Sequence, residues 1–106
     1  MHQIPEPVRV LVEAANAGDV DAFLAGFTKE GAVDDWGRVF RGADAIRSWS
    51  DAEFIGKQVS LAVTLVEERD GETVVGAEVG GHGFNGPSHF SFRVEHDAVT
   101  RMTIRA

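Results

Sequence analysis

The sequence predicts an α+β fold in which three helices come first and mostly antiparallel strands follow. Apolar residues recur at helical spacing in the N-terminal half. From Lys57 onward they alternate with more polar residues, which is the period of a half-buried strand. This separation of helices from strands along the chain is typical of α+β domains. The 106 residues, 43% apolar and 25% charged, suit a single domain over residues 1–106.

Two helices are predicted in the first 30 residues. Pro7 suits the first position of a helix, and Gly18 suits the left-handed residue that ends it. Asp19 can cap the second helix at once, and Gly31 is expected to stop that helix. The apolar stripes are Val8, Leu11, Val12 and Ala15 in the first helix, and Val20, Phe23, Leu24 and Phe27 in the second.

A short hairpin and a third helix are predicted next. The hairpin runs through Asp34-Asp35-Trp36-Gly37. The third helix follows Gly42, with Asp44 as a possible cap. Its apolar positions are Ile46, Trp49 and Phe54.

The remaining chain is predicted to form strands joined by turns. Val59, Leu61, Val63 and Leu65 alternate along the first strand, and Asp70-Gly71 is a strong hairpin signal before a return strand over 73–79. Residues 80–87 form a glycine-rich connection. Phe90, Phe92 and Val94 then share the core face of the next strand, so His89 is expected to point away from it. A turn over 96–98 leads into a last strand over 99–105.

Charge and composition exclude several classes of function. The formal net charge of -7 disfavours nucleic acid and anionic membranes as partners, because both need basic patches. The absence of cysteine excludes disulfides, thiol catalysis and thiolate metal sites. Residues 1–5 lack the pattern of a signal peptide, and no apolar run approaches the roughly 20 residues of a membrane span. We therefore expect a cytoplasmic protein.

Asp34 and Asp35 are the main candidates for a chemical role. Neighbouring side chains on a strand point to opposite faces, so one aspartate can face the core while the other faces water. The functional interpretation is a general base whose pKa is raised by desolvation. The structural interpretation is a solvated strand end, with either aspartate paired to Arg38 or Arg41.

Three segments carry a family resemblance. They are Ala15-Asn16-Ala17-Gly18-Asp19 between two helices, Val33-Asp34-Asp35 at a strand end, and Arg41-Gly42-Ala43-Asp44-Ala45-Ile46 opening a helix. Nearly the whole chain resembles the nuclear transport factor two-like superfamily, also called SnoaL-like or ketosteroid-isomerase-like. The resemblance implies three helices packed into a strongly curved mixed sheet, a cone-shaped cystatin-like roll enclosing a pocket. It also implies a homodimer. This fold hosts many functions.

The resemblance also implies a position for a general base. In ketosteroid isomerases this base is an aspartate at the end of the first strand, and counting without gaps from Gly18-Asp19 places it at Asp35. Matching the following glycine instead would place it at Asp34. The tyrosine of the isomerase falls on Leu11, and its second acid falls near His89 or Phe90. The steroid-type oxyanion hole is therefore missing, which argues against true ketosteroid isomerase activity.

The expected pocket residues are aromatic, imidazole and amide side chains. Trp36 is expected beside Asp35, where its indole would desolvate and could hydrogen-bond the carboxylate. No histidine pair has metal-site spacing, so neither a metal nor another cofactor is expected. Residues 81–86 match G-x-G-x-x-G, but an aromatic strand rather than a helix follows, which excludes a dinucleotide site. The candidate ligand-binding residues are Trp36, Trp49, His82, Phe84 and Asn85.

Two functions from different classes are consistent with these residues. The first is a pocket protein for a compact, apolar, carbonyl-containing molecule, with Asp35 as general base for an isomerase, cyclase or dehydratase step. The second is a non-catalytic ligand-binding or dimeric interaction domain. There Asp35 would only make hydrogen bonds or a structural ion pair with Arg38 or Arg41.

Overall fold

Three helices and six strands make up residues 4–106, the part of the chain that the computed structural model describes. The expected absence of a signal peptide depends in part on residues 1–3, which lie outside the described residues. The helices are α1 (Glu6–Ala17), α2 (Val20–Ala25) and α3 (Ala43–Glu53), and a short 3-10 turn, η1 (Ile55–Lys57), follows α3. The strands are β1 (Phe27–Asp35), β2 (Arg38–Arg41), β3 (Ser60–Arg69), β4 (Glu72–Gly80), β5 (Gly86–Glu95) and β6 (Ala98–Arg105).

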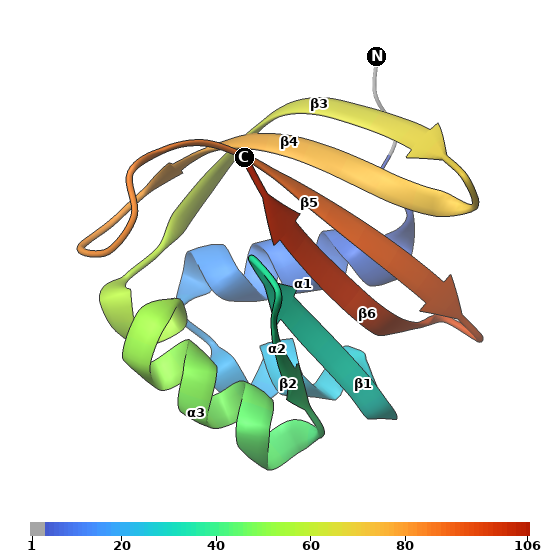
Figure 1. Ribbon diagram of the computed structural model, residues 1–106, viewed down its shortest axis with the longest axis horizontal. Coiled ribbons are helices and arrows are strands. Elements are labelled where there is room, and N and C mark those ends of the chain that lie inside the picture. Colours follow the sequence, from blue (N-terminus) through green and yellow to red (C-terminus); the bar gives the residue numbers. More distant parts are fainter. Residues whose placement is uncertain (1–3) are drawn as a thin grey trace.

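The six strands form one open mixed sheet in the order β2-β1-β6-β5-β4-β3. Neighbouring strands are antiparallel except for β1 and β6, which are parallel. Figure 1 shows the three helices on one side of this sheet. The predicted α+β class, with three helices and a mostly antiparallel mixed sheet, is confirmed. No helix within residues 4–106 is long and apolar enough to cross a membrane.

The first two helices begin as predicted, but the second ends early. Gly18 closes α1 in the left-handed conformation, with φ of 72°, and the Asp19 side chain caps α2 by accepting the Ala22 N–H at 3.0 Å. The predicted continuation of α2 to Gly31 is wrong, because β1 starts at Phe27 and pairs with β6. Phe27 belongs to β1, but its ring still packs edge-on against Phe23, with 5.3 Å between the ring centroids. This contact explains why Phe27 shares the apolar pattern of the helix.

The start of α3 also differs from the prediction. Its cap is Gly42, with φ of 87°, and Asp44 lies within the first turn instead of capping the helix. The Gly42 N–H donates to the carbonyl of Gly31 at 2.8 Å, so the chain entering the helix is held by β1. The buried face of α3 carries Ile46, Trp49 and Ser50.

A bulge changes which residues of β3 face the core. The pairing with β4 shifts between Val63 and Leu65, and a one-residue slip reverses the faces beyond it. Leu61 lies opposite Val79 on the inner face, whereas Val66 lies opposite the buried Val75. The predicted alternation through Leu65 is therefore wrong.

Leu65, which was predicted to face the core, lies instead on the outer face of the sheet. A Cβ on Gly76 would meet the Leu65 Cβ at 3.2 Å, which places Leu65 on the outer face. Phe90 and Phe92 are buried on the inner face of β5, while His89 is exposed, as predicted.

A side chain from α1 holds the edge strand β3 against the helices. The Asn16 amide donates to the Leu61 carbonyl at 3.1 Å and accepts the Leu61 N–H at 2.6 Å. These two bonds occupy backbone groups that an edge strand would otherwise leave unpaired. Asn16 thereby fixes the position of β3 relative to α1.

Candidate functional site

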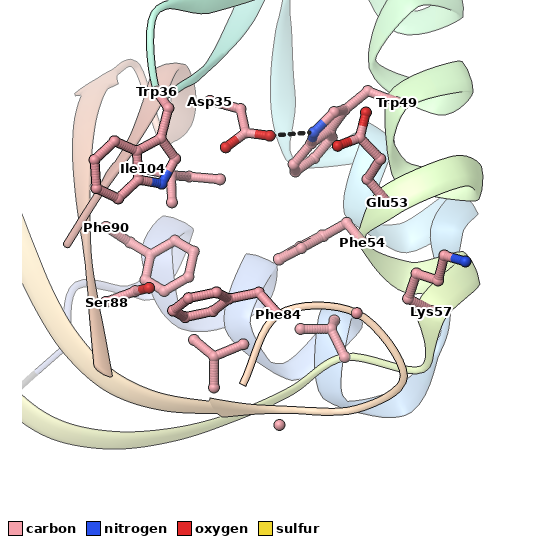
Figure 2. Close-up of a pocket in the computed structure, with 14 residues that line it drawn as sticks. Asp35, Trp36, Trp49, Glu53, Phe54, Lys57, Phe84, Ser88, Phe90 and Ile104 are labelled. Atoms are coloured by element: carbon pink, nitrogen blue, oxygen red, sulfur yellow. Dashed lines mark hydrogen bonds between the residues drawn. The ribbon is translucent and has the colours of Figure 1, made fainter. Parts of the chain in front are cut away.

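A cavity of about 360 Å³ opens between the sheet and α3, at the end of the molecule where β1 stops. Its walls come from the β1–β2 turn, α3, η1, the β4–β5 loop and the inner faces of β4, β5 and β6 (Figure 2). We call this cavity the Asp35 pocket. It is lined by Asp35, Trp36, Trp49, Glu53, Phe54, Lys57, Val59, Val79, Gly80, Gly83, Phe84, Ser88, Phe90 and Ile104.

Asp35, the last residue of β1, places its carboxylate in this pocket. Its side chain is 14% exposed. The indole N–H of Trp49 donates to Oδ2 at 3.0 Å, and the guanidinium of Arg38 donates to the same oxygen at 2.5 Å (Figure 2 shows the Trp49 bond). No side-chain hydrogen bond within residues 4–106 uses Oδ1. This oxygen can therefore accept a hydrogen bond, or a proton, from a molecule in the pocket.

Asp34 lies on the opposite face of β1 and stabilises the sheet. Its carboxylate accepts the Gly37 N–H at 2.8 Å, and it pairs with Arg105 at 3.1 Å and Arg101 at 3.4 Å. The hydrogen bond from Arg105, the bond from Gly37 and the charge of Arg101 lower the pKa of Asp34 against the opposing effect of burial. Asp34 therefore joins the β1–β2 turn to β6 outside the Asp35 pocket.

Arg38 joins the β1–β2 hairpin to α3. Its guanidinium pairs with Asp35 and also donates to both oxygens of Glu53, at 2.7 and 2.9 Å. The hydrogen bond from Arg38 lowers the pKa of Glu53. The ion pair between Asp35 and Arg38 is one of the alternatives expected from the sequence. Arg41 instead donates to the Glu30 carbonyl at 3.1 Å.

Trp49 supplies the indole that hydrogen-bonds to Asp35, where Trp36 was expected to do so. The Trp49 ring is 3% exposed and stacks between Phe40 at 6.1 Å and Phe54 at 4.8 Å. Trp36 occupies the turn after β1 with φ of 55° and is 58% exposed. Both indoles line the Asp35 pocket, Trp49 as part of the core and Trp36 at the rim.

The β4–β5 loop supplies one candidate ligand-binding residue to the wall and leaves two outside it. Phe84 lines the Asp35 pocket and is 58% exposed, whereas His82 and Asn85 are not among its lining residues. The Asn85 amide donates to the carbonyls of Gly81 and Gly83, at 2.9 and 3.2 Å, and so holds the loop in shape. The loop leads directly into β5.

Several lining residues were not predicted from the sequence. Glu53, Phe54 and Lys57 come from the end of α3 and from η1, whose position depends on how α3 packs. Ser88 had a usable signal, because it lies two residues before Phe90 and therefore on the same inner face of β5. No three His, Asp or Glu side chains within residues 4–106 gather as a metal site would require.

Solved structures with the same architecture identify the fold. A protein from Sinorhizobium meliloti, described as a candidate polyketide cyclase, is 23% identical and has a TM-score of 0.86, with 96% of this chain and 95% of that chain covered. A Catenulispora acidiphila protein with a ketosteroid isomerase-like fold, solved in complex with trimethylamine, is 21% identical and has a TM-score of 0.82, with 98% and 87% covered. Other neighbours are described as NTF2-like. This chain has the NTF2-like fold.

The NTF2-like fold also includes a computationally designed 17-OHP binder. It is 16% identical, with a TM-score of 0.80 over 99% of this chain and 92% of that chain. A scan against protein-family models finds no match, and a search of curated proteins finds none. The expected nuclear transport factor two-like fold is thus confirmed. Because one fold can host many functions, the function must be inferred from the residues of the Asp35 pocket.

Proposed function

We propose that the protein binds a compact, apolar, carbonyl-containing molecule in the Asp35 pocket. In this proposal Asp35 removes a proton from a carbon next to the carbonyl, in an isomerase-, cyclase- or dehydratase-type step. One observation carries the proposal: Trp49 and Arg38 both donate to Oδ2 of Asp35, while no side-chain hydrogen bond from the described residues uses Oδ1, and the carboxylate lines an aromatic cavity. Two donors on one oxygen fix the orientation of the carboxylate, as a general base requires.

The size and walls of the cavity support a compact apolar ligand. Small-molecule sites typically occupy 300–1,000 Å³ and combine apolar walls with a few polar groups. The Asp35 pocket, at about 360 Å³, is near the lower end of that range. Four rings besides Trp49 line it, those of Trp36, Phe54, Phe84 and Phe90.

The structural neighbours support a small-molecule site in this fold. One was solved with trimethylamine, and another was designed to bind 17-OHP. A third is described as a candidate polyketide cyclase, which is one of the reaction types proposed here. The chemical differences between these molecules agree with a fold in which the pocket residues, and not the backbone, select the ligand.

A non-catalytic ligand-binding or interaction domain is the second candidate. The observation that favours it is the ion pair between Asp35 and Arg38, because this pair compensates the charge of the carboxylate as a structural salt bridge does. In either function we propose a homodimer through the outer face of the sheet. The cytoplasm stays the predicted location.

Hydrogen–deuterium exchange on a simple ketone separates the two candidates. In D2O, a base in the pocket should speed the exchange of the α-protons of cyclohexanone, followed by proton NMR. We expect Asp35→Asn to lower the protein-dependent exchange rate by about 100-fold or more, since general-base catalysis contributes about 10²–10⁴-fold. Asp34→Asn is the matched control, because it removes the neighbouring carboxylate outside the pocket and should leave the exchange intact.

Binding and exchange, measured on the same protein samples, show which of the two candidate functions is wrong. Binding of cyclohexanone without faster exchange would exclude the general base and leave the non-catalytic function. The absence of both binding and exchange would contradict the proposal of a carbonyl site. Circular dichroism of both variants establishes that each is folded before the rates are compared.

A further inference from the structure

We infer that Glu53 is a positioning residue for Asp35: it occupies the fork of the Arg38 guanidinium and so leaves one oxygen of the Asp35 carboxylate for the ligand. This inference rests on the proposed function, because it explains how a base can work beside an arginine. It gives a role to a pocket carboxylate that the proposed reaction does not use. Glu53 acts through Arg38 rather than on the ligand.

Arg38 is placed to bind Asp35 on both oxygens. The two residues lie directly opposite each other in the β1–β2 ladder, where the Cβ atoms of facing residues are about 4.5–5.5 Å apart. Arginine frequently binds a carboxylate with two parallel N–H···O bonds. A pair formed in this way would engage Oδ1 as well as Oδ2, and the cation would then hold the whole carboxylate.

Glu53 takes the fork of Arg38 instead. The two terminal nitrogens of the guanidinium donate to its two oxygens, Nη1 to Oε2 at 2.9 Å and Nη2 to Oε1 at 2.7 Å. Asp35 receives one bond from Nη2, on Oδ2 at 2.5 Å. The guanidinium therefore binds Glu53 through two nitrogens and Asp35 through one, which leaves Oδ1 of Asp35 outside the ion pair.

The surroundings of Arg38 and Glu53 keep this arrangement in place. The Arg38 guanidinium lies over the ring of Phe40, 5.6 Å from its centroid, and Phe40 stacks in turn on Trp49. Glu53 is the last residue of α3, where the helix dipole disfavours a carboxylate that has no cation beside it. Figure 2 shows the Glu53 side chain next to Trp49 at the wall of the pocket. The ion pair thus has a defined position beside the base.

The charges of the three side chains favour a base at Asp35. The hydrogen bond from Arg38 lowers the pKa of Glu53, so Glu53 is ionised at neutral pH. One cation then serves two carboxylates, and one negative charge stays uncompensated. Without Glu53, the whole charge of Arg38 would act on Asp35 and make its carboxylate a weaker base.

A substitution that keeps the shape of Glu53 and removes its charge tests this role. In Glu53→Gln, Arg38 can turn its fork to Asp35. We expect the protein-dependent exchange of the cyclohexanone α-protons at pH 7 to fall about fivefold, and the pH of half-maximal exchange to fall by about one unit, since a nearby cation favours the ionised carboxylate. Lys57 in the pocket and Asp34 on the opposite face of β1 keep their charges in this variant, so the shift reports Glu53.

Three further variants separate this role from a purely structural one. Glu53→Ala should give the same shifts as Glu53→Gln. Arg38→Gln removes the cation and should raise the pH of half-maximal exchange, which is the opposite direction. Adding Glu53→Gln to Arg38→Gln should change the rate by less than about twofold, because the residue through which Glu53 acts is then absent.

Glu13→Gln is the matched control. It removes a carboxylate from an exposed ion pair of the same kind, formed with Arg9 at 2.8 Å on α1, away from the pocket. The rate of exchange and its pH profile should both equal those of the wild type. Circular dichroism of each variant establishes that it is folded before the rates are compared.

The outcomes separate this inference from the proposed function. If the wild type speeds exchange and the Glu53 variants keep its rate and its pH of half-maximal exchange, the role of Glu53 is refuted and the general base stands. An equal loss from Glu53→Gln with and without Arg38 would also refute it, because Glu53 would then act without the arginine. If the wild type does not speed exchange, the proposed base and this inference both fail.

Discussion

The two adjacent aspartates show how one residue step on a strand separates two roles. Asp34 and Asp35 have the same side-chain exposure, 14%, yet their partners differ completely. Asp34 pairs with arginines of β6, and Asp35 contacts Trp49 and Arg38 at the pocket. Since strand geometry alternates the faces, a substitution at each position should affect a different property of the protein: stability at Asp34 and ligand chemistry at Asp35.

Asp34→Asn should destabilise the protein in a pH-dependent way. The pKa of Asp34 is lowered in the folded state, so its stabilising contribution is present above the unfolded-state pKa of about 3.9 and is lost as the pH falls through the lower, folded value. At pH 7 we expect a loss of about 1–2 kcal/mol in the free energy of unfolding, typical of charge-assisted hydrogen bonds that are partly exposed. Urea unfolding at pH 7 and at pH 2.5 measures the loss.

At the lower pH the difference in stability between the wild type and Asp34→Asn should be smaller, because pH 2.5 lies below the unfolded-state pKa and the contribution of the carboxylate falls as the pH approaches the lower, folded value. The exposed Asp51→Asn is the control and should stay within about 0.5 kcal/mol of the wild type at both pH values. A constant difference between the wild type and Asp34→Asn across this range would show that the carboxylate charge has no part in the effect.

At the scale of elements, the junction of α3 and η1 builds one side of the pocket. The chain turns sharply after Phe54, and this turn brings Glu53, Phe54 and Lys57 to the pocket wall. Gly56 allows the turn because its α-carbon lies against the backbone of α3. A Cβ at this position would stand 1.7 Å from the carbonyl oxygen of Asp51.

Gly56→Ala should therefore weaken both the fold and the site. The added methyl group cannot fit without moving the backbone of α3 or η1, and overpacking of this kind costs about 1–3 kcal/mol. Thermal unfolding measures the loss, and titration with cyclohexanone should show weaker binding. Gly83→Ala is the matched control for stability, because its Cβ would meet the flexible Lys57 side chain at 3.4 Å and the Glu53 carbonyl oxygen at 3.7 Å, both without a clash. Equal effects of both substitutions would contradict this account of the junction.

At the scale of the whole molecule, the three helices cover one face of the sheet, and no helix within residues 4–106 covers the other (Figure 1). On that outer face Leu65 and the 8% exposed Val74 lie near the small Gly76, and Arg93 pairs with Glu72 at 2.9 Å beside them. An apolar centre with charged groups around it resembles the surface of a protein interface. This arrangement supports the proposed homodimer through the outer face.

Sedimentation at micromolar concentration tests the dimer. We expect the wild type to sediment at about twice the chain mass of 11.4 kDa. Leu65→Glu, which introduces a charge at the centre of the outer face, should sediment as a monomer. Ser48→Glu, an equivalent charge at an exposed position of α3 on the helical side of the sheet, is the control. A monomeric wild type would refute the dimer.

The sequence by itself determined the element types, most turns and the position of the key carboxylate. The turns depend on local backbone conformation: Gly18 and Asp19 join two helices, and Asp70-Gly71, with φ of 54° and 79°, forms the turn of a hairpin. The alternation of side chains along a strand places Phe90 and His89 on opposite faces. The gap-free count from Gly18-Asp19 that the family resemblance supplied ends at Asp35, the last residue of β1. The turns and the strand faces needed only neighbours within a few residues.

Only the tertiary structure decided which side chains meet. The end of α2 was set by the pairing of Phe27 with β6, and the faces of β3 by a bulge. The indole partner of Asp35 was set by the packing of α3, which brings Trp49 within 3.0 Å across 14 residues of chain. These contacts join distant segments, and their energies depend on burial and distance, which a local pattern does not encode.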